Sequence, residues 1–427
     1  MASGREVAVI GGGWAGLAAA VESVRQGHRV TLFEMARQFG GRAREVVVDG
    51  LALDNGQHIC IGAYRETLRL LRTVGVAEAS VFMRTPLRLP YADGPGLALG
   101  AGPPLPAFVA AVFRHPTWRL PEKAALASKA LGWWLAGFHC DPARTVAQLT
   151  ADLPDSVRSE LIDPLCVAAL NTPAPAASAS VFLRVLRDAL FAGKGSADLL
   201  LPKASLGDIL PGPAKRWLES SGARLCSGHR VEALARIEGG WSVDGLRFDG
   251  VVLAASAREA ARLARPHDPA WADRADALAY EPIVTVYLRS AGTRLPSPML
   301  ALRPGGGGEA PAQFVFDRGQ LNGPEGLLAF VISGAAEWVA RGPDATLDAV
   351  RRQALAALGP SLKGALATVQ VVTEKRATFL CTPGLSRPGM RIAEGLVAAG
   401  DHLESPYPST LEGAVRSGLA AAQALAC

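Results

Sequence analysis

Three glycines near the start of the chain have the spacing of a dinucleotide-binding turn. Gly11, Gly13 and Gly16 fit the pattern G-x-G-x-x-G. In that pattern the first glycine permits a tight turn, the second lets a pyrophosphate approach the backbone, and the third lets a helix pack closely on a strand. Glu34 follows roughly 20 residues later, where a carboxylate accepts hydrogen bonds from a ribose 2′-hydroxyl. These residues predict a site for a nucleotide cofactor, with its phosphates at a helix N-terminus.

The flanking elements are those that this chemistry needs. Val7–Ile10 and Val30–Phe33 are apolar runs typical of buried strands, and the small residues Ala18, Ala19 and Ala20 predict a closely packed helix between them. A chance glycine turn is the alternative interpretation. The order strand, turn, helix, strand and acid favours the dinucleotide site instead.

Two loops after Glu34 carry further candidate residues. Residues 35–44 read MARQFGGRAR, which places the flexible Gly41 beside the cation of Arg42. We expect this loop to lie near the same pyrophosphate, and an exposed basic turn is the alternative.

The second loop lies within LALDNGQHICIGAY, residues 51–64. Its D-N-G sequence is typical of a hairpin turn. Gln57 and His58 follow that turn and stand beside the predicted nucleotide domain. They are either functional or simply part of a connection between two strands.

Composition limits the class of protein. With 427 residues the chain can form two sizeable domains, and 49% hydrophobic against 19% charged residues indicates a globular protein. The net charge of +5 includes no run of Lys or Arg, so we expect no nucleic-acid partner. The six cysteines have no C-x-x-C spacing, which predicts no metal site and a reducing compartment.

We also expect a cytoplasmic protein. The first strand begins too early for a signal peptide, and no uncharged apolar run reaches the roughly 18 residues of a spanning helix. Any membrane contact would therefore be peripheral, on the inner face of the cell membrane. The candidate segment is 106–139, where Trp118, Trp133 and Trp134 alternate with basic residues as in an interfacial helix. A helix pair packed on its own domain is the alternative.

The rest of the chain alternates helical and strand patterns. We expect an amphipathic helix at 65–74, a layer of proline-broken helices at 145–190, and short strands at 230–234 and 241–243. A buried parallel strand at 249–255 should return to the nucleotide domain. Further strands are expected at 282–289, 313–316, 327–332 and 368–373, with a glycine loop at 305–308, a helix at 344–358, and a last strand ending in Gly400-Asp401 before a small-residue helix.

Glu34, the G-G-R at 40–42 and the late Gly400-Asp401 resemble the amine oxidase and phytoene desaturase flavoproteins. The resemblance implies an α/β fold with FAD bound in a discontinuous Rossmann-like domain. That domain would comprise residues 1–75, 200–260 and 385–427. Residues 76–199 and 261–384 would form a substrate-binding domain of mixed β-sheet and helices.

Longer segments narrow the resemblance. LDNGQHICIGAY, LNTPAPAASASVFLRVLRDALF, LLLPKASLGDILPGPAKRWL, EKRATFLCTPGLSRPG and AAGDHLESPYPSTLEGAVRSG are similar to the hydroxysqualene dehydroxylases of squalene and hopanoid biosynthesis. This similarity implies reduction of hydroxysqualene to squalene, with loss of water and a hydride from reduced flavin. The implied partners are a long apolar isoprenoid substrate and an electron donor, either NAD(P)H or a reductase.

The resemblance also implies roles for individual residues. The glycine turn would hold the pyrophosphate, Glu34 the adenosine ribose, the backbone of Val231 the adenine, and Asp401 the ribityl chain. The N-terminus of the last helix would face the flavin ring. The expected FAD-binding residues are Gly11, Gly13, Trp14, Ala15, Gly16, Glu34, Met35, Arg37, Gly41, Arg42, Gln57, His58, Val231, Gly400, Asp401, Thr410 and Leu411.

The reaction needs a proton for the departing water, so a general acid must lie within hydrogen-bond reach of the hydroxyl. His58 and Tyr407 are the candidates, and the alternatives are turn residues bonded to their own backbone, or an ordered water. His402 departs from the tryptophan common in the family, and no lysine accompanies the strand at 282–289, which disfavours amine substrates.

Two other functions remain open. A carotenoid desaturase or an amine oxidase would share every FAD motif. A non-redox prenyl-lipid binding protein would share the fold but would not need Glu34, Arg42 and Asp401.

Overall fold

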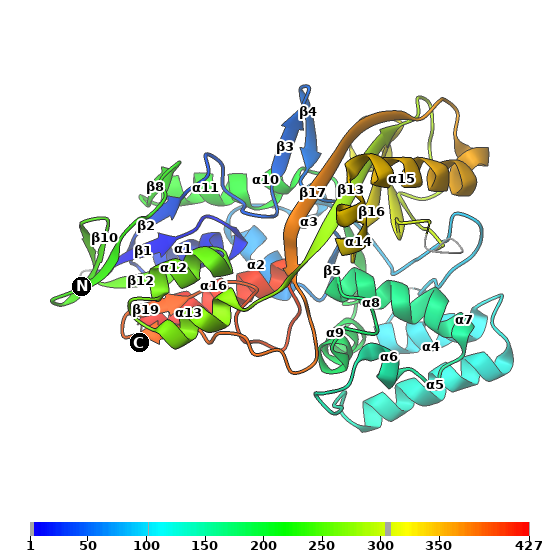
Figure 1. The fold of residues 1–427 in the computed structure, drawn as a ribbon, viewed down its shortest axis with the longest axis horizontal. Helices are drawn as coiled ribbons and strands as arrows, with labels where there is room; N and C mark the ends of the chain where they lie inside the picture. The colour runs from blue at the N-terminus through cyan, green and yellow to red at the C-terminus, as the bar shows by residue number, and fades with distance from the viewer. Residues whose placement is uncertain (1–3, 101, 304–308, 427) are drawn as a thin grey trace.

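The computed structural model describes residues 4–100, 102–303 and 309–426, so the glycine loop expected at 305–308 lies outside the described residues. Figure 1 shows a lobe built on a parallel sheet beside a second lobe, in which an antiparallel sheet lies next to a layer of helices. The N- and C-terminal ends of the described chain lie close together in the first lobe.

The first lobe contains a six-stranded sheet in the order β18-β19-β12-β1-β2-β8. β12, β1, β2, β8 and β19 are parallel neighbours, and β18 is an antiparallel edge strand. The predicted return of the strand near 249–255 is confirmed, because Val251 pairs with Ala8. The strands are β1 (Glu6–Ile10), β2 (Arg29–Glu34), β8 (Arg224–Ser227), β12 (Gly250–Leu253), β18 (Arg391–Ala393) and β19 (Leu396–Ala398).

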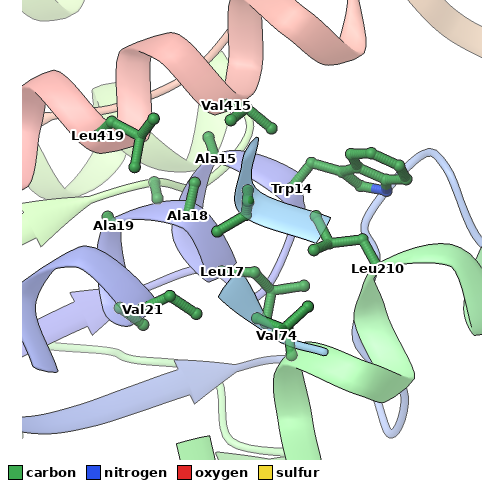
Figure 2. Close-up of a cluster of buried hydrophobic side chains, with 14 of the residues drawn as sticks. Trp14, Ala15, Leu17, Ala18, Ala19, Val21, Val74, Leu210, Val415 and Leu419 are labelled. Atoms are coloured by element: carbon green, nitrogen blue, oxygen red, sulfur yellow. The ribbon is translucent and has the colours of Figure 1, made fainter. Parts of the chain in front are cut away.

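Helices cover both faces of this sheet, which is why its central strands are apolar throughout. One face carries α1 (Trp14–Arg25), α2 (Arg65–Thr73), α11 (Pro211–Ser220) and α16 (Leu411–Ala426), and the other carries α12 (Ala257–Ala264) and α13 (Pro269–Asp276). α1 lies against α16, with Ala15, Ala18, Val415 and Leu419 in their shared core (Figure 2). A Cβ on Gly418 would stand only 2.1 Å from the carbonyl oxygen of Ala15, so this close approach requires glycine.

Short sheets and helices connect the larger layers. β3 and β4 form a hairpin, β5, β7 and β6 form a three-stranded sheet, and β9 to β11 form a meander. Their bounds are β3 (Glu45–Val48), β4 (Leu51–Asp54), β5 (Cys60–Ile61), β6 (Phe82–Thr85), β7 (Leu199–Pro202), β9 (Leu234–Ile237), β10 (Gly240–Val243), β11 (Leu246–Phe248), α3 (Glu78–Val81) and α10 (Leu206–Ile209).

The expected strand at 230–234 is wrong, because β9 begins only at Leu234. The backbone just before β9 forms hydrogen bonds with a side chain instead of with a neighbouring strand. Asp244 Oδ1 accepts hydrogen bonds from the N–H groups of Glu232 (3.0 Å) and Ala233 (2.8 Å).

The second lobe contains an antiparallel sheet in the order β14-β15-β16-β13-β17. β17 is longer than the strand expected at 368–373, because it pairs with β13 along nearly its whole length. The elements are β13 (Tyr280–Arg289), β14 (Met299–Ala301), β15 (Phe314–Asp317), η3 (Arg318–Leu321), β16 (Leu327–Ile332), α14 (Ala336–Arg341), α15 (Pro343–Leu358), η4 (Gly359–Ser361) and β17 (Ala367–Phe379).

The helical layer contains α4 (Pro104–Arg114), α5 (Leu120–Leu135), α6 (Val146–Leu149), α7 (Asp155–Val157), η1 (Arg158–Ile162), α8 (Asp163–Leu170) and α9 (Ala179–Phe191). Asn171 ends α8 in a left-handed conformation and joins this layer to the sheet. Its amide donates to the carbonyl of Glu281 (3.2 Å) and to Thr378 Oγ1 (3.0 Å), while its oxygen accepts from the N–H of Gly334 (2.7 Å).

Candidate functional site

One large cavity of about 930 Å³ runs from the parallel sheet into the second lobe. It begins at the carboxyl ends of β1 and β2, beside Ile10 and Phe33, where doubly wound sheets bind their ligands. It continues between the antiparallel sheet and the helical layer. A nucleotide site and a second chamber therefore share a single space.

The glycine turn forms a cradle at one end of this cavity. Gly11 has φ +108°, and a Cβ there would stand 2.5 Å from the oxygen of Ala254. A Cβ on Gly16 would stand 1.8 Å from the oxygen of Gly11, so Gly16 serves the packing of α1 on the turn. A Cβ on Gly13 would meet only Gly41, at 3.8 Å, and would occupy the space between the two loops.

The N-terminus of α1 is suited to an anion. Gly13 offers no capping side chain, and the first turn contains no acidic residue. The first N–H groups of a helix have no intrahelical partner and carry a partial positive charge. Gly13, Trp14 and Ala15 line the cavity here, so the turn can hold a pyrophosphate.

Glu34 is buried at the end of β2 and organises the turn. One carboxylate oxygen accepts a hydrogen bond from the N–H of Gly12 (2.6 Å), and the other accepts from the N–H of Ala36 (2.7 Å). Each carboxylate oxygen has a second lone pair. Glu34 can therefore fix the loop and still accept a bond from a ribose hydroxyl.

Asp401 and Arg42 form an ion pair beside the cradle. Arg42 also donates to the carbonyl of Ala377 on β17 (2.8 Å). Burial alone would raise the pKa of Asp401, but the neighbouring Arg42 guanidinium holds it below its ordinary value. Ser409 donates a further hydrogen bond to the same carboxylate.

His402 lies next to this ion pair and is almost fully buried. Burial lowers the pKa of its imidazole to about 4, so the ring is neutral near pH 7. Its Nε2 atom is buried without a hydrogen-bond partner among the described residues. The ring lines the cavity.

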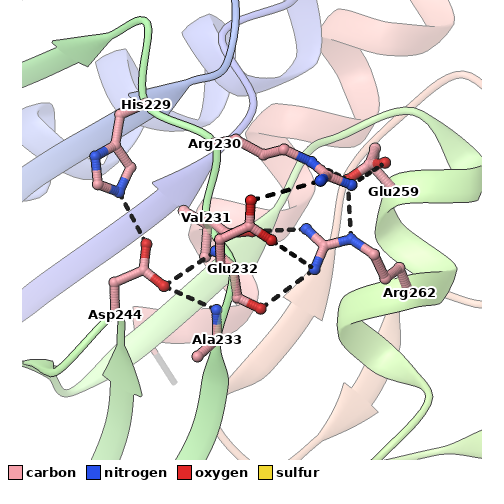
Figure 3. A network of polar contacts seen from close by, with 8 residues as sticks. All are labelled: His229, Arg230, Val231, Glu232, Ala233, Asp244, Glu259 and Arg262. Carbon is pink, nitrogen blue, oxygen red and sulfur yellow. Dashed lines mark hydrogen bonds and ion pairs between the residues drawn. The ribbon is translucent and has the colours of Figure 1, made fainter.

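Figure 3 shows the polar network that holds Val231, which lines the cavity. Arg262 donates to the carbonyl of Val231 (2.6 Å), and Glu259 bridges Arg262 to Arg230. His229 bonds to Asp244 (2.8 Å), whose other oxygen holds the following backbone. The backbone of Val231 is therefore held in a fixed position beside the cavity.

The loop at 54–58 is fixed from the second lobe. Arg318 donates to Gln57 Oε1 (3.0 Å) and lies 3.9 Å from the carboxylate of Asp54. His58 Nδ1 lies 2.7 Å from the carbonyl of Gly56, so it carries the ring proton. Burial lowers the pKa of His58. The neutral ring leaves its Nε2 as an acceptor.

Tyr407 lies in the loop that precedes α16. Its hydroxyl accepts a hydrogen bond from Arg184 (2.6 Å), and the guanidinium groups of Arg184 and Arg416 lie 4.7 and 5.3 Å from its ring centre. The N-terminus of α16 follows. There the buried Glu412 accepts hydrogen bonds from the N–H groups of Glu66 and Thr67, and so joins α16 to α2.

The far part of the cavity is apolar. The helical layer contributes leucines and a phenylalanine, and the antiparallel sheet contributes bulky side chains from its inner face. The lining residues include Phe108, Leu161, Leu165 and Leu186 from the first, and Ile283, Met299, Phe314, Phe316 and Val331 from the second.

The structure brings nearly all of the predicted site residues to this cavity. Every residue in the expected set except Gly16 lines it, including both general-acid candidates, His58 and Tyr407. Their roles toward a ligand remain predictions. Sequence reasoning did not single out Asp188, Arg318, Glu374 and Glu412, which stand on or beside the cavity. Asp188, Glu374 and Glu412 lie in segments that resemble the family, but nothing in those segments marks them as site residues. Among the described residues no cluster of side chains could hold a metal ion.

A sequence model of flavin-containing amine oxidoreductases matches residues 14–426. The chain belongs to this family. The hydroxysqualene dehydroxylase of Rhodopseudomonas palustris is 30% identical, over 98% of this chain and 97% of its own length. The hydroxysqualene dehydroxylase of Zymomonas mobilis is 26% identical, over 97% of each chain. The expected flavoprotein family is therefore confirmed.

Solved structures of this flavoprotein fold also resemble the chain. An oxidoreductase from Methanosarcina mazei aligns with a TM-score of 0.71 at 16% identity, over 98% of this chain and all of that one. Cyclohexylamine oxidase from Brevibacterium oxydans aligns with a TM-score of 0.68 at 19% identity, over 99% of both. These likenesses confirm the expected α/β fold.

Proposed function

We propose that this protein is an FAD-dependent hydroxysqualene dehydroxylase, which reduces hydroxysqualene to squalene. The observation that carries the proposal is the single cavity that joins the cradle at Gly13 to the apolar chamber at Leu161. Full-length relatives of the same named activity support it. An enzyme for a long hydrocarbon with one hydroxyl group needs this combination of a cofactor seat and a dry chamber.

FAD fits the residues at the first end of the cavity. The open cradle at Gly13 and the uncapped N-terminus of α1 suit its pyrophosphate. Glu34 suits the adenosine ribose, and the backbone of Val231 the adenine. Asp401, Thr410 and Leu411 would face the ribityl chain and the flavin ring. We propose the same division into domains as the sequence predicts, with FAD in residues 1–75, 200–260 and 385–427.

The reaction breaks the C–O bond of the alcohol and forms a C–H bond. The departing oxygen takes a proton and leaves as water, and reduced FAD, when bound, supplies the hydride. The residues of this chain would orient the hydroxyl, keep other water out of the chamber and hold the proton donor. The inner face of the antiparallel sheet and the leucines of the helical layer provide the exclusion of water.

Two side chains are candidates for the proton donor. His58 is disfavoured, because its only ring proton faces the carbonyl of Gly56 and burial lowers its pKa. Burial raises the pKa of Tyr407, so its phenol keeps a proton throughout the physiological range. Tyr407 is therefore the better candidate at neutral pH.

Amine oxidation is the less favoured chemistry. β13 presents Ile283 to the cavity, and no lysine is among the described residues that line it. A carotenoid desaturase would use the same cavity but would oxidise its polyene substrate. An assay of both reactions is therefore needed to distinguish a desaturase from a dehydroxylase.

The test is an anaerobic single turnover. Purified protein with bound FAD is reduced with dithionite and mixed with hydroxysqualene in detergent. We expect reoxidation of the flavin with one squalene formed for each flavin. A flavin that stays reduced would refute the proposal, and oxidised enzyme would then be assayed with phytoene-like polyenes and with amines.

We further propose that the helix pair α4–α5 contacts a membrane surface. Among the described residues no helix has both the length and the apolar composition to cross a bilayer. The pair nevertheless exposes a group of large apolar side chains. They are Val109, Phe113, Leu120, Leu131, Trp134 and Leu135. An amphipathic surface of this kind lies in the membrane interface with basic residues at its edge, and it would place the chamber beside the source of its substrate.

A further inference from the structure

A carboxylate stands where the apolar chamber meets the flavin end of the cavity. α9 presents Val185, Leu186, Ala189 and Leu190 to the chamber, and Asp188 lies on the same lining face. The loop before α16 brings Tyr407 to the same place. The Asp188 side chain is 27% exposed, so it is half-buried among these apolar neighbours.

Arg184 fixes the geometry of both groups. Its Nε donates to Asp188 Oδ1 (3.1 Å), one helical turn along α9, and its terminal nitrogen donates to the hydroxyl oxygen of Tyr407 (2.6 Å). The guanidinium also stacks over the Tyr407 ring at 4.7 Å. One cation therefore holds a carboxylate and a phenol together at the wall of the cavity.

The three side chains form one connected group. The Tyr407 oxygen accepts from Arg184, and the phenol also forms a side-chain hydrogen bond with Asp188. Asp188 Oδ1 accepts from Arg184 as well. The phenol donor and the carboxylate acceptor therefore stand side by side, and an alcohol that enters between them can accept from the first and donate to the second.

We propose that Asp188 and Tyr407 together bind the hydroxyl group of the alcohol substrate. The hydroxyl hydrogen is donated to Asp188, and the hydroxyl oxygen accepts from the O–H of Tyr407. Arg184 is a positioning residue for both. This inference rests on the proposed function, and it adds Asp188, for which the sequence predicts no role.

The arrangement explains how product could leave. A site built to bond a hydroxyl rejects an analogue that lacks it, because its polar groups are then left without partners. Squalene lacks the hydroxyl that hydroxysqualene carries. The site should therefore bind the substrate more tightly than the product, although the two share the same hydrocarbon chain.

The test measures binding without turnover. FAD-loaded, oxidised protein is titrated with hydroxysqualene and with squalene in micelles of one detergent, and flavin fluorescence reports the two dissociation constants. The alcohol forms two hydrogen bonds and displaces the one between Tyr407 and Asp188. One net hydrogen bond to a charged group predicts a preference for the alcohol of at least about 10-fold. Asp188→Ala and Tyr407→Phe should each reduce that preference to less than about 3-fold, mainly because each variant binds the alcohol more weakly.

Asp155→Ala is the matched control. Asp155 pairs with Arg158 on the same helical layer, but its side chain is 91% exposed and lies outside the cavity lining. It should leave the preference unchanged. If Asp188 had only a structural role, Asp188→Ala would weaken the binding of hydroxysqualene and of squalene equally. That result would overturn the inference, and so would a wild-type protein that binds both ligands equally well.

The outcome is independent of the turnover assay. A protein that forms squalene but shows no change of preference in Asp188→Ala and Tyr407→Phe would retain the proposed function and refute the hydroxyl site. A protein that prefers the alcohol but forms no squalene would retain the site and refute the reaction.

Discussion

Arg42 and Asp401 are 359 positions apart in the sequence and form an ion pair beside the glycine turn. The pair joins the first piece of the parallel-sheet lobe to the last. Arg42 also donates to Ala377 on β17, so the same side chain contacts the antiparallel sheet. Three separated segments of the chain depend on one guanidinium.

Replacement of Asp401 tests this junction. Asp401→Asn leaves Arg42 without its counter-charge, and we expect a loss of about 2 kcal/mol in the free energy of unfolding, together with weaker FAD retention. Urea denaturation and flavin content measure the two effects. Glu394→Gln is the control, because Glu394 pairs with Arg236 at an exposed position. Equal effects of the two variants would mean that Asp401 has no special structural role.

The carboxylate of Glu34 has a separate, measurable role. Glu34→Gln loses one of the two acceptors that serve Gly12 and Ala36. We expect a loss of about 1–2 kcal/mol in stability without ligand and at least about 10-fold weaker FAD binding. Calorimetric titration of the stripped protein with FAD measures the affinity. Glu219→Gln, at an exposed position, should change neither the stability nor the affinity for FAD.

Two glycines of the same motif should respond differently to alanine. The Cβ of Gly13→Ala projects into the cradle and meets only Gly41, at 3.8 Å. This variant should fold normally and lose FAD. The Cβ of Gly16→Ala meets the Gly11 oxygen at 1.8 Å, so stability should fall by more than about 2 kcal/mol. Thermal unfolding of the two FAD-free proteins separates these outcomes, and a stable Gly16→Ala would contradict the assigned packing.

His402 predicts a particular dependence of stability on pH. Its pKa falls from the ordinary value of 6.5 to about 4 in the folded protein, so below pH 6.5 the unfolded chain binds the extra proton. Stability should therefore fall as the pH drops from 6.5 toward 4, by about 2 kcal/mol between pH 7 and pH 5 from this residue. Urea denaturation of His402→Gln at both pH values should show a smaller loss than the wild type. An identical loss in both proteins would contradict a neutral His402.

Adjacent tryptophans on α5 separate membrane binding from folding. Trp134 is 52% exposed and Trp133 only 8%. Trp134→Ala should weaken binding to vesicles of phosphatidylcholine and phosphatidylglycerol without a change in Tm. Trp133→Ala should lower stability by about 3–5 kcal/mol. Co-sedimentation with vesicles measures the binding, and undiminished binding of Trp134→Ala would count against the proposed membrane face.

Local patterns predicted the parts of the fold that depend on neighbours in sequence. The turn at Gly11, the strand at Leu327–Ile332 and the helix near Asp344 follow from apolar periodicity and turn chemistry. The expected interfacial role of Trp118, Trp133 and Trp134 does not hold for Trp118 and Trp133, which are buried. Successive helical side chains point about 100° apart, and nothing local says which of the adjacent Trp133 and Trp134 faces the protein.

The polar part of the site was less accessible to sequence reasoning. Asp188, Arg318 and Glu412 each contact a residue far away in the chain. Asp188 looks like an ordinary i, i+4 partner of Arg184 on an amphipathic helix. Its proposed role in binding substrate becomes apparent only because the loop before α16 places Tyr407 beside it.

The order of strands in the parallel sheet has a consequence for folding. β1 pairs with β12, and α1 packs against α16, although most of the described chain separates α1 from α16. Such distant pairings fold slowly and leave apolar surface open to aggregation. The apolar face of α1 is therefore exposed until α16 packs on it, and a variant without α16 should aggregate.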